Sequence, residues 1–351
     1  HAFSRLTWDG ETVALRDRPA LTMGQATVVP PPGAFLQATE QGEHGVGAGE
    51  QGGAGAFVLH AGVHEARAAG QVHMHQVVGE VAVFALRQVV FDHGALRTVA
   101  AANTGALPQG ELAFKRVLEP LGFAVADVYP LPRLKMTGRA YCHQDAPEQV
   151  AQFFVSELHV DQFSPAFQAA VNKVVSTSRD PLSSEDKALL ATLSDKRELP
   201  FADAASLLPK LVGCFDVQHA TPALADYHTL LQESAEMAWI STEGNAFNHA
   251  TDHVADVFAT ADELRAKGQP IKDKVEVSAS GRVRQTAFKA AQVEREFIDA
   301  DGQRVSRIVP GSFYEFITRD RYTDEAGNDK LDLRFDSSNA QGIFKMTAAA
   351  C

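Results

Sequence analysis

The stretch VVFDHGALRT at residues 89–98 places a histidine and an arginine four residues apart in a run that resembles a buried β-strand. Side chains two and four residues apart on a strand share one face, so His93 and Arg97 are expected on one face and Asp92 on the other. An imidazole can bind a metal, and a guanidinium can bind a carboxylate. The same residues also fit a hydrogen-bonded core histidine and a surface arginine at a strand end.

A second strand-like run, FNHATDH, carries His249 and His253 on one predicted face. A third, SFYEFITR, places Glu315 between aromatic residues. A carboxylate in such surroundings is costly to bury unless it is paired or bound to a metal. Arg319 lies four residues on and on the same face, where it could form a salt bridge with Glu315 or orient it as a metal ligand.

His93, His249 and Glu315 together match the ligand types of a 2-His-1-carboxylate site, which leaves open positions on Fe(II). The three residues are far apart along the chain, so only the tertiary fold could bring them together. Glu157, in FVSELHV, is an alternative metal ligand, since it takes the place in an earlier predicted unit that Glu315 takes in a later one.

Further polar residues could meet a substrate or a metal. In RVRQTAFK at residues 282–289, Gln285 and Lys289 are expected on one strand face, where they could bind a substrate carboxylate or remain solvated. Near the start of the chain, histidines recur at metal-like spacing within a low-complexity stretch: His60, His64, His73 and His75.

The elements that must position these residues fall into blocks. Residues 81–160 predict the order strand, helix, strand, strand, strand, with a helix over 109–122 that ends at a glycine. Residues 161–240 carry helical spacing throughout, and residues 241–351 repeat the βαβββ order. Residues 1–80 are glycine-rich and poorly defined. The prediction is an α+β fold in which paired βαβββ modules form a curved mixed sheet around a metal site, with a helical insert.

Composition limits the class of protein. The chain has 351 residues, 45% of them hydrophobic and 22% charged, as is usual for a globular protein. Its net charge of −12 argues against nucleic acid as the main partner. No run is apolar enough for a membrane span. Three scattered cysteines and the lack of a visible signal peptide predict a cytoplasmic protein.

Several motifs, taken in order, resemble one family, the 2-oxoadipate dioxygenase/decarboxylases, which have a vicinal-oxygen-chelate (glyoxalase-like) fold. The resemblance covers roughly residues 85–347, including the closing SSNAQGIFKMT. Its motifs are DHGALRT, FFVSELHVDQFSP, AW…FNHAT, RQTAFKA and PGSFYEFITRDRY.

The resemblance implies that His93, His249 and Glu315 bind the metal, and that Arg97 binds the substrate. It also implies Fe(II) as cofactor and a small 2-oxo acid and O2 as partners. The implied reaction converts 2-oxoadipate and O2 into 2-hydroxyglutarate and CO2, a step of lysine catabolism.

Two alternatives remain open from the residues alone. One is a glyoxalase-like lyase or isomerase of the same fold that uses Zn(II) or Ni(II) without redox chemistry. The other is a metal-free protein of this fold that binds a small ligand. Metal content and oxygen uptake separate these possibilities.

Overall fold

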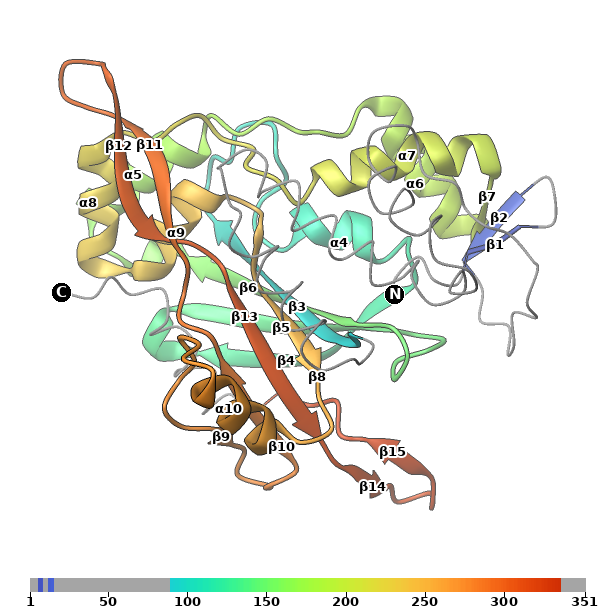
Figure 1. Cartoon of the computed structure of the whole chain (residues 1–351). Coiled ribbons are helices and arrows are strands. Elements are labelled where there is room, and N and C mark those ends of the chain that lie inside the picture. The colour runs from blue at the N-terminus through green and yellow to red at the C-terminus, as the bar shows by residue number, and fades with distance from the viewer. Residues whose placement is uncertain (1–5, 9–11, 16–88, 336–351) are drawn as a thin grey trace, which may run out of the picture.

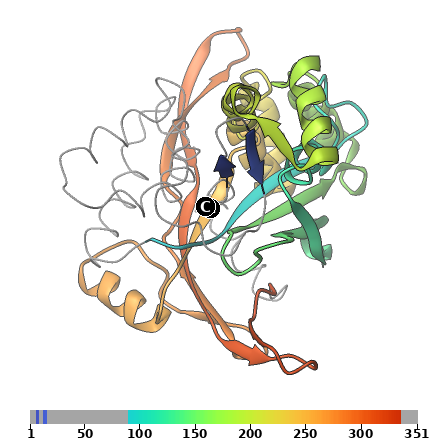
Figure 2. The ribbon, with the colours of Figure 1, turned by 90° about the vertical axis from the view of Figure 1, so that its right-hand side faces the viewer.

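An eight-stranded sheet forms the centre of the structure, a computed structural model that describes residues 6–8, 12–15 and 89–335. The strand order is β4-β5-β6-β3-β8-β13-β10-β9, and the sheet is curled (Figures 1 and 2). The early histidines at positions 60, 64, 73 and 75 lie outside the described residues.

The first half of the sheet is one βαβββ module. Its elements are β3 (Phe91–Ala100), α4 (Leu112–Leu118), β4 (Phe123–Leu131), a 3₁₀ turn (Pro132–Leu134), β5 (Met136–His143) and β6 (Gln152–His159). The α4 helix is shorter than the predicted 109–122, but Phe114, Val117 and Leu118 are buried along one face, as the spacing indicates. Gly122 has φ +88° and ends this turn of chain.

The second half repeats this order. Its elements are β8 (Phe247–His253), α10 (Val257–Ala266), β9 (Glu276–Val277), β10 (Val283–Ala287), β11 (Gln292–Ile298), β12 (Arg304–Pro310) and β13 (Phe313–Arg319). The hairpin β11–β12 forms a separate two-stranded sheet, so it is an insertion between β10 and β13. A short hairpin of β14 (Arg321–Thr323) and β15 (Asp329–Leu331) comes next.

The two modules correspond strand by strand. In each module the first strand pairs in parallel with the last (β3 with β6, β8 with β13), and the last pairs antiparallel with the strand before it. The two first strands, β3 and β8, pair antiparallel and join the halves at the middle of the sheet. The predicted fold of paired βαβββ modules in a curved mixed sheet is therefore confirmed.

A helical block separates the modules. It contains a 3₁₀ turn (Val160–Gln162), α5 (Pro165–Val175), α6 (Ser184–Lys196), β7 (Glu198–Pro200), α7 (Phe201–Gly213), α8 (Leu224–Glu233) and α9 (Ala235–Glu243). Ser183 and Asp186 form a reciprocal capping box at the start of α6. Two strands near the start of the chain, β1 (Leu6–Trp8) and β2 (Thr12–Leu15), pair with each other, and β2 pairs with β7. The division of the chain at residues 80, 160 and 240 stays a prediction.

The two faces of the sheet are covered differently. The outer face, which carries Leu96 and Val155, packs against α4, α6 and α7. On the second module, Tyr314 and Phe316 of the outer face pack against α10. The inner face carries His93, Ala95 and Glu315. At its far end, Val99 and Leu158 join one core with α5, α8, α9 and the β11–β12 hairpin. Among the described residues, no helix has the length and apolarity that a membrane crossing requires.

Gly94 is needed where β3 and β8 meet. A Cβ atom at this position would lie 2.5 Å from the Phe247 ring, which stacks on Phe215 at a centroid distance of 5.2 Å. We expect Gly94→Ala to destabilise the protein by about 1–3 kcal/mol, because the stacked rings must shift to admit the methyl group.

Urea denaturation measures this change. Gly213→Ala is the matched control, since nothing lies within 4 Å of a Cβ there and Gly213 is the last residue of helix α7. Equal stability of the two variants would contradict the packing argument.

Candidate metal centre

Three buried side chains from three adjacent strands converge on the inner face of the sheet. His93 of β3, His249 of β8 and Glu315 of β13 each offer one ligand atom, and these atoms lie within 4.8 Å of one another. Both histidine Nε2 atoms lie 3.6 Å from Glu315 Oε2. The strand pairing explains the cluster, since Thr251 lies opposite His93 on one side and Glu315 on the other.

Each histidine comes directly after a residue that interrupts the pairing of β3 with β8. A shift of register between Phe91 and His93 leaves Asp92 as an extra residue in β3. A second shift makes Asn248 the extra residue in β8, so Phe247 packs with the outer-face core while His249 turns to the inner face. Two β-bulges thus aim the two imidazoles at the same point.

The bulged residues also orient the imidazoles. Asp92 Oδ2 lies 2.7 Å from His93 Nδ1, and Asn248 Oδ1 lies 3.2 Å from His249 Nδ1. Carboxylate and amide oxygens accept hydrogen bonds, so each contact favours a proton on Nδ1, and in the neutral ring this leaves the Nε2 lone pair available on the side of Glu315. Strict alternation placed Asp92 on the opposite face. That expectation is wrong, because the bulge lets its carboxylate contact the ring of the next residue.

Glu315 is the least compensated group of the cluster. Its residue is 0% exposed, Oε2 accepts a hydrogen bond from Thr251, and Oε1 has no hydrogen-bond partner among the described residues. Burial raises the pKa of Glu315, although the neighbouring His93 and Lys272 oppose this shift. Burial, together with the nearby cations Arg97 and Lys272, lowers the pKa of His249 well below 6.5, so this imidazole is neutral.

The donor set fits a divalent cation. Two imidazole nitrogens with free lone pairs and a buried carboxylate face one another, and a carboxylate oxygen without a hydrogen-bond donor is stabilised by a cation. Non-haem Fe(II) sites use these three ligand types, and some Zn(II) enzymes use them too. The geometry therefore indicates a metal centre and leaves the identity of the metal to other evidence.

Comparison with known proteins decides the family. A family model described as 2-oxoadipate dioxygenase/decarboxylase matches residues 68–346, most of the chain. This chain belongs to that family. A rice protein with the same name, described as chloroplastic/amyloplastic, is 22% identical over 285 residues, which cover 74% of this chain and 70% of the rice protein.

Solved structures agree with this fold. A glyoxalase superfamily protein from Ralstonia eutropha JMP134 is 52% identical, with a TM-score of 0.73, over 80% of this chain and 85% of that protein. Hydroxyglutarate synthase from Oryza sativa, solved with 2-oxoadipate, has a TM-score of 0.60 at 17% identity, over 95% of this chain and 98% of that one. The chain is thus an enzyme of the 2-oxoadipate dioxygenase/decarboxylase family with a glyoxalase-like fold.

In this family member, Arg97 extends from β3 toward helix α9. Its side chain is 2% exposed, and Nη2 lies 2.6 Å from Oε2 of Glu236. The guanidinium also lies 5.0 Å from the ring centroid of Trp239 on the same helix. Burial lowers the pKa of Arg97, and the Glu236 carboxylate counteracts that shift. No sequence pattern pointed to Glu236, because its partner is distant along the chain.

Arg319 was expected to pair with Glu315, but in the described part of the chain it pairs with Asp92 instead. Among the described residues its guanidinium donates to both oxygens of Asp92, at 2.6 and 2.9 Å, and to two backbone carbonyl oxygens. Burial alone would raise the pKa of Asp92, but the charges and hydrogen bonds of Arg319 and His93 hold it well below its usual range. Arg319 therefore supports His93 through Asp92.

Glu157 is not brought to the three ligands. It lies on the outer face of β6, where its Oε2 accepts from the backbone N–H of Glu111 at 2.8 Å. The strand register explains the difference. His93 lies opposite Gln152 and His249 opposite Phe313, so the residue of β6 that corresponds to Glu315 is Phe154.

The two other predicted substrate-binding residues, Gln285 and Lys289, lie in different surroundings. Gln285 is buried on β10 and donates to Glu276 at 3.4 Å. Glu276 also pairs with Lys272 at 3.0 Å. Lys272 is a cation near Glu315 that no sequence motif had indicated. Lys289 lies beyond the end of β10 with an exposed side chain, so it does not share that strand face. The substrate-binding roles of Gln285 and Lys289 stay predictions.

The two histidines of β8 provide a direct test of the ligand set. His249 faces Glu315, whereas His253 is 27% exposed and lies 4.0 Å from Asp92. We expect His249→Ala to weaken Co(II) binding by about 100-fold or more, since a ligand is lost, and His253→Ala to change it little.

Anaerobic titration with Co(II), followed by its visible absorption, measures both affinities, and circular dichroism verifies the fold. Equal weakening in the two variants would show that His249 is not a ligand.

Proposed function

We propose that this chain is an Fe(II)-dependent dioxygenase that converts 2-oxoadipate and O2 into 2-hydroxyglutarate and CO2, a step of lysine catabolism. The observation that carries the proposal is the convergence of His93, His249 and Glu315 in a member of the 2-oxoadipate dioxygenase/decarboxylase family. The substrate is supported by the rice hydroxyglutarate synthase structure, which contains 2-oxoadipate. The predicted cytoplasmic location is not addressed by these findings and stays a prediction.

His93, His249 and Glu315 would hold the iron through two Nε2 atoms and one carboxylate. When bound there, Fe(II) supplies open coordination positions for a 2-oxo acid and O2, together with the one-electron chemistry that O2 requires. The protein contributes the orientation of the ligands. Asp92 and Asn248 keep each Nδ1 protonated, so each Nε2 remains available as a donor.

Arg97 would bind the carboxylate at the far end of the substrate. His93 and Arg97 are four residues apart on a regular strand, a separation of about 13 Å at 3.3 Å per residue. When a dicarboxylic 2-oxo acid is held at the metal by one end, its second carboxylate needs a binding partner farther along the site. A planar guanidinium binds such a group in bidentate fashion. Glu236 neutralises Arg97 in the absence of substrate, so a substrate carboxylate would share the guanidinium or displace Glu236.

Aromatic side chains would exclude water beside the metal. Tyr129, Phe154 and Phe335 form a cluster on the inner face together with the small residues Ala95 and Ala140. Phe335 lies edge-on to His93 at a centroid distance of 4.8 Å. A dry wall of this kind strengthens electrostatic interactions within the site and limits loss of reactive species to water.

Oxygen consumption tests the reaction class. We expect anaerobically purified protein loaded with Fe(II) to consume O2 when 2-oxoadipate is added, and to release CO2 in equal amount. His93→Ala should abolish this uptake, because one of the three ligands is lost.

Bound metal without any uptake would contradict the dioxygenase proposal and favour a non-redox lyase or isomerase. A wild-type protein that binds no metal would contradict the metal centre as well.

Arg97→Lys tests the binding of the distal carboxylate. Lysine keeps the charge but loses the bidentate fork, so we expect KM for 2-oxoadipate to rise by about 10–100-fold, which corresponds to the 1.5–3 kcal/mol of a charged hydrogen bond. KM for 2-oxohexanoate, which lacks the second carboxylate, should change far less.

Arg295→Lys is the matched control, since Arg295 pairs with Glu243 on the same helix α9. A similar rise in KM for both acids, or in both variants, would contradict the role of Arg97.

A further inference from the structure

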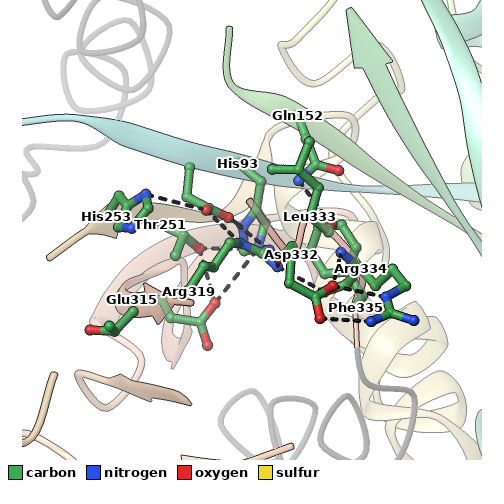
Figure 3. A network of polar contacts seen from close by, with 12 residues as sticks. His93, Gln152, Thr251, His253, Glu315, Arg319, Asp332, Leu333, Arg334 and Phe335 are labelled. Carbon is green, nitrogen blue, oxygen red and sulfur yellow. Dashed lines mark hydrogen bonds and ion pairs between the residues drawn. The ribbon is translucent and has the colours of Figure 1, made fainter. Parts of the chain in front are cut away.

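The chain returns to the metal centre after β15. The segment Asp332–Phe335, here called the closing segment, lies beside His93 and Arg319 (Figure 3). The Phe335 ring lies edge-on to His93, and its backbone N–H donates to the hydroxyl oxygen of Tyr129 at 3.0 Å. The closing segment is thus one wall of the centre.

Arg319 holds the closing segment by its backbone. One terminal nitrogen, Nη1, donates to the carbonyl oxygens of Asp332 and Arg334, each at 2.8 Å. The guanidinium carbon also lies 5.2 Å from the Phe335 ring centroid. Because the two hydrogen bonds go to backbone carbonyl oxygens, they hold the path of the backbone and do not depend on the side chains of the segment.

The rest of the same guanidinium holds Asp92. Nε and Nη2 of Arg319 donate to the two Asp92 oxygens, and Asp92 in turn accepts from His93 Nδ1 at 2.7 Å. The side chains of Arg319 and Asp92 are 0% and 2% exposed. A planar group of fixed geometry therefore joins the metal ligand on one side to the closing segment on the other.

The charge balance makes this link specific. Asp92 is neutralised by Arg319, whereas the carboxylate of Asp332 is paired with Arg282 and Arg334. The closing segment therefore needs Arg319 for its backbone carbonyls rather than for its charge. If the segment leaves, two buried N–H directions of Arg319 lose their acceptors, and the guanidinium that orients Asp92 is less restrained.

We propose that Arg319 is a positioning residue that couples the seating of the closing segment to the orientation of His93, so that metal binding and closure of this wall stabilise each other. The inference rests on the proposed metal centre and goes beyond it, because it assigns closure of the wall to the metal-loaded state. Such coupling is reciprocal. A link that strengthens metal binding tenfold also makes opening of the segment tenfold rarer when metal is bound.

Trypsin reads the opening of the segment directly. Arg334 has a side chain that is 57% exposed, yet the peptide bond on its carboxyl side leads to Phe335, which is partly buried and packed against His93. Cleavage after Arg334 therefore requires the segment to leave the wall. The rate of this cleavage is followed by mass spectrometry in metal-free protein and in protein saturated with Co(II).

We expect Co(II) to slow this cleavage about tenfold in the wild-type protein. Arg319→Lys should weaken Co(II) binding by about 10–100-fold, as is typical for loss of a group behind a metal ligand. It should also remove the protection, so that cleavage is fast even at saturating Co(II). Asp92→Asn removes one of the two oxygens that accept from Arg319, so it weakens the link from the ligand side and should likewise reduce the effect of the metal on cleavage.

Gln152→Leu is the matched control. Gln152 donates to the carbonyl oxygen of Leu333 at 3.2 Å and is not joined to Arg319. This variant should speed cleavage equally with and without Co(II), and leave Co(II) affinity within about twofold.

The outcomes distinguish two failures. Wild-type protein that binds Co(II) but is cleaved at the same rate with and without it would overturn the coupling and leave the metal centre intact. Arg319→Lys and Asp92→Asn proteins that both keep metal protection would also overturn the coupling. Wild-type protein that binds no Co(II) would overturn the metal centre, the proposed function and this inference together.

Discussion

A buried carboxylate with one oxygen lacking a hydrogen-bond donor is the constraint on which the rest of this site depends. Glu315 lies on a central strand at 0% exposure, with one oxygen bound to Thr251 and the other without a hydrogen-bond partner among the described residues. Such a group is costly unless a cation completes it. Two imidazoles face it, and the nearby Lys272 is paired with Glu276, so a metal ion is the completing charge that the surroundings favour.

The sheet provides this arrangement through two irregularities at corresponding places. Asp92 and Asn248 are the extra residues of two β-bulges, and each comes directly before a histidine of the candidate metal site. Each bulged residue therefore turns the next imidazole to the inner face and also accepts a hydrogen bond from its Nδ1–H. Gly94 allows the two strands to approach at this point, since any larger residue would meet the Phe247 ring.

The two modules share a fold but divide the chemistry. The second module supplies His249 and Glu315, while the first supplies His93 and has Phe154 at the position that corresponds to Glu315. The first module thus contributes one candidate ligand and an aromatic wall. The helical block adds Glu236 against Arg97, and the end of the described chain adds Phe335 against His93. The site is therefore assembled from every part of the described chain after residue 88.

Local sequence patterns were sufficient to predict the modules, the residue types of the site and the family. Alternating and 3.6-residue patterns predicted two βαβββ units on either side of a helical block. The spacing within one strand placed His93 and Arg97 on the same face. These are properties of short stretches of backbone, so the order of the residues carries them directly.

The partners of each charged residue, in contrast, depend on the three-dimensional fold. Arg319 contacts Asp92 rather than Glu315, Arg97 pairs with Glu236, and Glu157 lies on the outer face. Strand alternation could not foresee these contacts, because a single extra residue in a strand reverses the face of the residues after it, and pairing between distant segments depends on register. The dipeptides Asp92-His93 and Asn248-His249 were visible in the sequence, but their meaning came from the bulges that the paired strands create.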